Sequence, residues 1–96
     1  MSEINLSIIQ KYSESDDART YRVLTADSAS EIPSGEYIYF KAIFENGIER
    51  TIKDSSGEVV KLTAIDDMVV LDYNFLKIKP IYVGSSKPSD LKVYEF

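Results

Sequence analysis

The dipeptide Asn46-Gly47, which lies between two apolar runs, constrains the fold of this chain more than any other feature. Both residues tolerate a positive φ, and such a pair between two apolar segments is typical of a β-hairpin turn. The sequence therefore predicts a hairpin over residues 36–53.

Two registers are compatible with this turn. A two-residue loop divides the large apolar side chains between both faces of the hairpin. A three-residue loop over 45–47, with Gly47 left-handed in a bulge, pairs Phe44 with Ile48 and Phe40 with Ile52. Because the second register collects the large side chains on one face, we expect the three-residue loop.

Further strands are indicated by short apolar runs between turn signals, among them the turn at residues 54–57. They are expected over residues 4–12, 20–26, 58–65, 68–73, 75–83 and 91–96. The continuous apolar run within 68–73 is typical of a strand buried on both sides. Pro80 has no N–H to donate, and this points to a sheet edge or a bulge.

About six to eight short strands with closely spaced turns indicate a mostly β fold, either a small antiparallel sandwich or a partly open barrel. Residues 14–30 leave an alternative, because Ser13 and Asp16 can form a capping pair for one short helix and give an α+β fold. The chain shows no internal repeat and no linker, so residues 1–96 are expected to form a single domain.

The chain contains neither histidine nor cysteine, which removes the commonest general base and most transition-metal ligands. Asp66 and Asp67 are the best remaining acid–base candidates. Adjacent strand residues point to opposite faces, however, and aspartate is a frequent turn former, so we expect a structural role for both. The segment 84–87 lacks the glycine spacing of a phosphate loop. We therefore expect no enzyme activity, no metal and no cofactor.

The formal net charge of −5 and the pI near 4.6 disfavour binding to a phosphate backbone, so nucleic acid is not an expected partner. No segment approaches the ~20 apolar residues that a membrane helix needs, so no membrane association is expected. The first ten residues lack the features of a secretory signal. With no cysteine to form disulfides, a cytoplasmic location is expected.

Seven tyrosines stand out, because tyrosine is enriched at protein interfaces. In the expected register, Tyr37, Tyr39 and Ile43 share the outer face of the hairpin with Lys41. An aromatic centre flanked by charge is typical of interface cores, so this face is predicted to contact another protein or a second copy of the chain. The alternative is that further strands cover the same face and make it core. The sequence leaves both open.

These observations favour a small acidic, non-catalytic protein-binding module of the inhibitor, immunity or adaptor type. The alternative is a β domain that binds a small-molecule effector, in which Tyr39, Phe40 and Phe44 would line a cavity.

Overall fold

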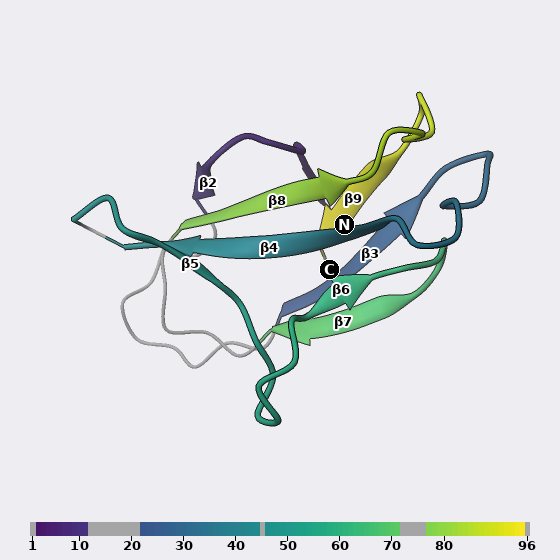
Figure 1. Cartoon of the computed structure of the whole chain (residues 1–96). Helices are drawn as coiled ribbons and strands as arrows, with labels where there is room; N and C mark the ends of the chain where they lie inside the picture. Colours follow the sequence, from purple (N-terminus) through teal and green to yellow (C-terminus); the bar gives the residue numbers. More distant parts are fainter. Residues whose placement is uncertain (1, 12–21, 45, 72–76, 96) are drawn as a thin grey trace.

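The structure, a computed structural model, describes residues 2–11, 22–44, 46–71 and 77–95, and this part of the chain is built from nine strands without a helix (Figure 1). The strands are β1 (Ser2–Ile4), β2 (Gln10–Lys11), β3 (Arg22–Asp27), β4 (Tyr37–Ile43), β5 (Glu49–Thr51), β6 (Lys61–Leu62), β7 (Met68–Leu71), β8 (Lys77–Val83) and β9 (Lys92–Glu95).

The strands form two antiparallel sheets that face each other in an open sandwich. One sheet has the order β1-β9-β3-β7, and the other has the order β2-β8-β4-β5, with β6 also paired to β4. Figure 1 shows β3 and β9 crossing behind β4 and β8. The mostly β fold class expected from the sequence is confirmed.

The core lies between the two sheets and is filled by alternate residues of their strands. Ile38, Phe40 and Ile78 from one sheet and Leu24 and Val93 from the other are fully buried. Burying a side chain of this size contributes roughly 1.5–3 kcal/mol relative to leaving it in water. The period of two along β4 therefore fixes which of its residues face outward.

The predicted hairpin and its register are confirmed. Ala42 lies opposite Arg50, the Phe44 N–H donates to the Ile48 carbonyl oxygen at 3.0 Å, and Gly47 has a φ of 81°. Phe44 and Ile48 lie on the predicted side of the sheet but are 42% and 45% exposed. They belong to the end of the hairpin and are not part of the core cluster.

The single strand expected over residues 4–12 is wrong. The chain turns at residues 6–8, where Ser7 has a φ of 63°, so β1 joins one sheet and β2 joins the other. The Ser7 N–H donates to the Pro80 carbonyl oxygen at 2.7 Å. The apolar alternation of Ile4, Leu6 and Ile8 runs through this turn and gives no sign of it, although the backbone crosses here from one sheet to the other.

Pro80 lies in β8, which has β2 on one side and β4 on the other, so β8 is not an edge strand. It stands opposite Phe40 of β4, while β2 pairs only with residues 77 and 78 of β8. On the side away from β4, Pro80 faces the turn at Ser7, whose N–H donates to the Pro80 carbonyl oxygen and requires no donor from the proline. The missing N–H is therefore tolerated at this position.

The expectation that the 68–73 strand is buried on both sides is also wrong. Within β7, Met68 is 63% exposed and Val70 is 57% exposed, whereas Leu71 is buried. The reason is that each sheet of the sandwich turns only one face to the core, so alternate residues of β7 face outward.

The strand predicted at residues 20–26 corresponds to β3, and residues 22–27 are accordingly not helical. Residues 28–30 of the possible helix are not helical either, and its residues 14–21 lie outside the described residues. The expected strand over 58–65 is reduced to β6, and those over 75–83 and 91–96 correspond to β8 and β9.

Candidate functional site

The surface that faces away from the core on the β2-β8-β4-β5 sheet contains the residues singled out from the sequence. In β4, Ile38, Phe40 and Ala42 point to the core, so the residues between them point outward. The strand registers place outward partners beside them on β5, β6 and β8. We call this surface the lysine–tyrosine face; it consists of Tyr37, Tyr39, Lys41, Ile43, Glu49, Thr51, Lys61, Lys77, Lys79, Ile81 and Val83.

Two tyrosines form the aromatic part of the lysine–tyrosine face. The ring centroids of Tyr37 and Tyr39 are 6.3 Å apart with an interplanar angle of 56°, and both side chains are half-buried. The Lys61 ammonium lies 4.4 Å from the centroid of the Tyr37 ring, which is a cation–π contact. Each ring is therefore held by a neighbour and still presents part of its surface to solvent.

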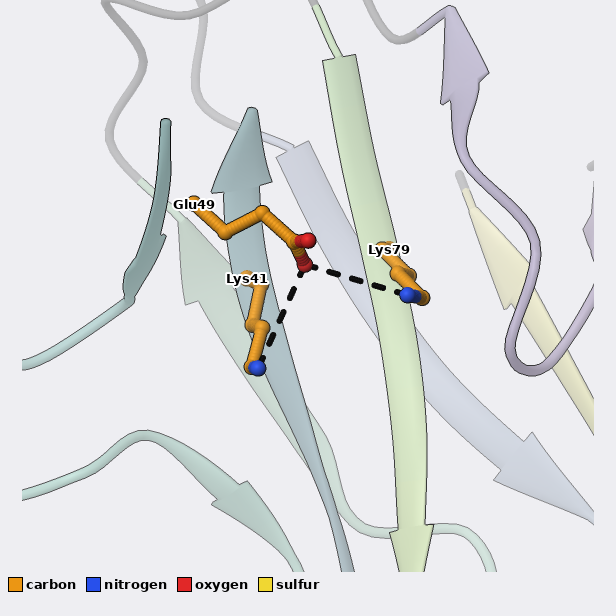
Figure 2. Close-up of polar contacts among 3 residues, drawn as sticks. All are labelled: Lys41, Glu49 and Lys79. Carbon is orange, nitrogen blue, oxygen red and sulfur yellow. Dashed lines mark ion pairs between the residues drawn. The ribbon is translucent and has the colours of Figure 1, made fainter. Parts of the chain in front are cut away.

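The polar part is an ion-pair cluster of three residues, drawn in Figure 2. Lys41 of β4 stands directly opposite Lys79 of β8, and Glu49 of β5 reaches across β4 to both. Its Oε1 atom is 4.0 Å from the Lys41 Nζ and 3.8 Å from the Lys79 Nζ. Like charges directly opposite one another in a sheet repel, and the shared carboxylate offsets this repulsion.

The four residues proposed from the sequence as a partner-binding surface do lie on one side of β4, but they are not equally accessible. Tyr37, Tyr39 and Lys41 are partly exposed, whereas Ile43 is only 7% exposed. Ile43 is therefore corrected from a contact residue to a supporting one, because it has almost no surface to offer a partner.

Sequence reasoning missed Lys61, Lys79 and Glu49. The hairpin register that was predicted already places Glu49 opposite Ile43, on the outer side, and this was a usable signal. Lys61 and Lys79 belong to β6 and β8, whose pairing with β4 depends on the topology of the whole sheet.

Tyr39, Phe40 and Phe44, proposed as the lining of a ligand cavity, do not converge. Phe40 is fully buried between the sheets, Phe44 is exposed at the end of the hairpin, and Tyr39 lies on the opposite side of the sheet. These three side chains therefore do not surround a common space.

Asp66 and Asp67 lie in the turn before β7. Asp66 has a φ of 65°, and its N–H donates to the Ala26 carbonyl oxygen at 3.0 Å. The Asp67 carboxylate accepts from the Met68 N–H at 3.0 Å, and the Thr25 hydroxyl donates to the Asp67 carbonyl oxygen at 2.7 Å. These contacts account for both aspartates as turn residues.

A second carboxylate, that of Glu36, ties the start of β4 to the chain after β8. It accepts from the Tyr82 hydroxyl at 2.7 Å and from the Ser86 N–H at 3.0 Å. Burial, together with the hydrogen bond and the negative charge of Glu36, raises the pKa of Tyr82 to about 12. In the 84–87 segment, the backbone donor of Ser86 is thus already used by an anion of the chain itself.

Among the described residues there is no group of three or more acidic, histidine or cysteine side chains placed to hold a metal ion. The same part of the chain has no helix of the length and hydrophobicity needed to cross a membrane.

Comparison of the chain with protein-family models, with curated proteins and with solved structures gives no match. Its function is therefore inferred from the residues of the lysine–tyrosine face.

Proposed function

We propose that this protein is a small non-catalytic protein-binding module of the inhibitor, immunity or adaptor type, and that it binds its partner through the lysine–tyrosine face. The observation that carries the proposal is the pair of half-buried tyrosines on an outward sheet face, with lysines on neighbouring strands. Tyrosine gives a large contact area for a small loss of conformational entropy, and flanking charges steer association.

The rigidity of the surface supports the same proposal. Tyr37 and Tyr39 lie on β4, which is paired on both sides, and their rings contact each other. A surface that is ordered before binding loses less entropy on association than a mobile loop does. A cytoplasmic location belongs to this proposal as well and is supported by the absence of cysteine.

The test uses Tyr39→Ser with Tyr94→Ser as the matched control. Tyr94 is also partly buried, but it lies in β9 of the other sheet. Each variant and the wild-type chain are immobilised and exposed to extract of the cells that produce the protein, and bound proteins are identified by mass spectrometry. We expect at least one protein to be captured by the wild type and by Tyr94→Ser but not by Tyr39→Ser.

Thermal unfolding of Tyr39→Ser gives the second measurement. We expect a loss of about 1–2 kcal/mol, because the side chain is only partly buried. A loss of ~3–5 kcal/mol, as for truncation of a core aromatic residue, would contradict the proposal. Retention of every captured protein by a folded Tyr39→Ser variant would contradict it too.

A further inference from the structure

The lysine–tyrosine face has the opposite charge to the chain as a whole. Among its residues are the four lysines Lys41, Lys61, Lys77 and Lys79, against the single carboxylate of Glu49. Its formal charge is thus +3, while the whole chain carries −5, so the rest of the chain carries −8. This separation of charge favours an acidic group as the ligand of the face.

The Lys41–Glu49–Lys79 cluster is the point at which a second carboxylate fits best. Two ammonium groups share one carboxylate oxygen at 3.8 and 4.0 Å, and their three side chains are between 27% and 37% exposed. One carboxylate leaves the pair of lysines with a net charge of +1. Because each ammonium has three donor hydrogens, a carboxylate from outside can bind beside Glu49 or replace it.

A protein segment fits the lysine–tyrosine face better than a nucleic acid does. Stacking of a base requires an open ring face, and the Lys61 ammonium stands 4.4 Å from the centre of the Tyr37 ring. A long polyanion would also meet the acidic remainder of the chain. A short acidic segment of a protein can contact the face without that repulsion.

A second copy of the chain is a poor occupant for the same surface. In a symmetric dimer the same patch meets itself, so a face of charge +3 would oppose another of charge +3. A symmetric dimer through this face is therefore disfavoured, and we seek the ligand in a different molecule.

We infer that the lysine–tyrosine face recognises an acidic segment of another protein, and that a glutamate or aspartate of this segment binds between Lys41 and Lys79, where it competes with Glu49. The inference rests on the proposed function and adds to it the charge of the partner and the position of its key contact. Glu49 then has two effects: it offsets one of the two positive charges of the lysine pair when the face is empty, and it weakens binding of the acidic segment.

The experiment uses a fluorescein-labelled octaglutamate peptide as the probe and needs no identified partner. Fluorescence anisotropy gives the dissociation constant, and amide chemical shifts in NMR spectra give the site and report that each variant is folded. The variants are Lys41→Gln, Lys79→Gln, their combination and Glu49→Gln. Lys92→Gln is the control, since it removes the same charge from an exposed position of β9 in the other sheet.

We expect shifts centred on β4 and β8, binding weakened about fivefold in the double lysine variant, and binding tightened about threefold by Glu49→Gln. Lys92→Gln should bind as the wild type does, and added salt should weaken binding. The inference is overturned if octaglutamate does not bind, if Lys92→Gln weakens binding as much as the double variant, or if Glu49→Gln leaves the affinity unchanged or lowers it.

Tighter binding of an oligothymidylate of equal charge would also overturn the inference, in favour of a nucleic-acid ligand. Failure of the inference about the acidic segment is distinguishable from failure of the proposed function. If a captured partner depends on Tyr39 but octaglutamate binding is independent of Lys41 and Lys79, the module binds protein by another chemistry. If octaglutamate binds as expected but no captured protein depends on Tyr39, the proposed function fails while the acid-binding cluster stands.

Discussion

Gly84 sits where the side chain of Glu36 crosses the chain after β8, and replacing it with alanine is expected to break the link between β4 and this segment. A Cβ atom on Gly84 would overlap the Cγ, Cδ and Oε1 atoms of Glu36. The overlap involves most of the glutamate side chain, so a small rotation of its carboxylate cannot relieve it. Glu36 would have to move away and give up both of its hydrogen bonds.

The magnitude follows from these contacts. Glu36 accepts hydrogen bonds from the Tyr82 hydroxyl and the Ser86 N–H. A hydrogen bond to a charged acceptor contributes ~1.5 kcal/mol at the lower end of its range, and we use this value because the site is partly exposed. Gly84 also has a φ of 142°, a conformation that strains an alanine by about 1 kcal/mol. Gly84→Ala should therefore destabilise the fold by about 4 kcal/mol.

Urea denaturation of a double-mutant cycle is the suitable assay. Glu36→Ala removes the obstacle and the hydrogen bonds together, so in that background Gly84→Ala should cost only the ~1 kcal/mol of backbone strain. The coupling between the two positions is thus about 3 kcal/mol. An equal loss of stability from Gly84→Ala in both backgrounds would refute the assignment of its role to Glu36.

Three further predictions concern stability. The pKa of Tyr82 is about 12 in the folded state, against an ordinary value of 10.0, so the folded state holds this proton more tightly than the unfolded state does. The contribution of Tyr82 to the free energy of unfolding is therefore complete below pH 10 and is lost as the pH rises to 12. After allowance for screening by solvent it amounts to about 1 kcal/mol, and urea denaturation from pH 9 to 12 should show it in the wild type but not in Tyr82→Phe. Gly47→Val should cost at least ~1 kcal/mol, because valine is strained at a φ of 81°, whereas Gly47→Asn should cost less; equal melting temperatures for the two variants would argue against the bulged turn. Asp66→Gly should be as stable as the wild type within ~0.5 kcal/mol, since glycine accepts the positive φ of 65°, and any turnover found in the wild type and lost in this variant would count against a purely structural role.

The hairpin was predictable down to its register because the information is local. The side-chain period of two and a turn of known length together fix which residues of β4 face those of β5, and Ala42 opposite Arg50 follows directly. The face of β4 that carries Tyr37 and Tyr39 follows from the same alternation. The partial exposure of Tyr37 and Tyr39 could not be predicted in this way, because it depends on which other residues pack against them.

The errors arose where distant parts of the chain decide local structure. Ser7 adopts a positive φ although it is neither glycine nor asparagine, because the backbone there passes from one sheet to the other. The run at Met68 looked buried on both sides because all its residues are apolar, yet β7 belongs to a two-sheet sandwich in which only one face of each sheet is turned to the core. Lys79 was missed as a neighbour of Lys41 because the sequence around β4 does not indicate that β4 pairs with β8.

The pairing of β1 with β9 has a consequence for how the protein forms. Ser2 lies opposite Glu95, so the sheet gains its first strand only when residues from the far part of the chain are present. Closing so long a loop is entropically unfavourable before other contacts exist, and β proteins dominated by such pairings fold in milliseconds to seconds. During synthesis β1 is made before β9 and remains without its sheet neighbour until β9 is available, so this sheet cannot be completed before β9 has been made.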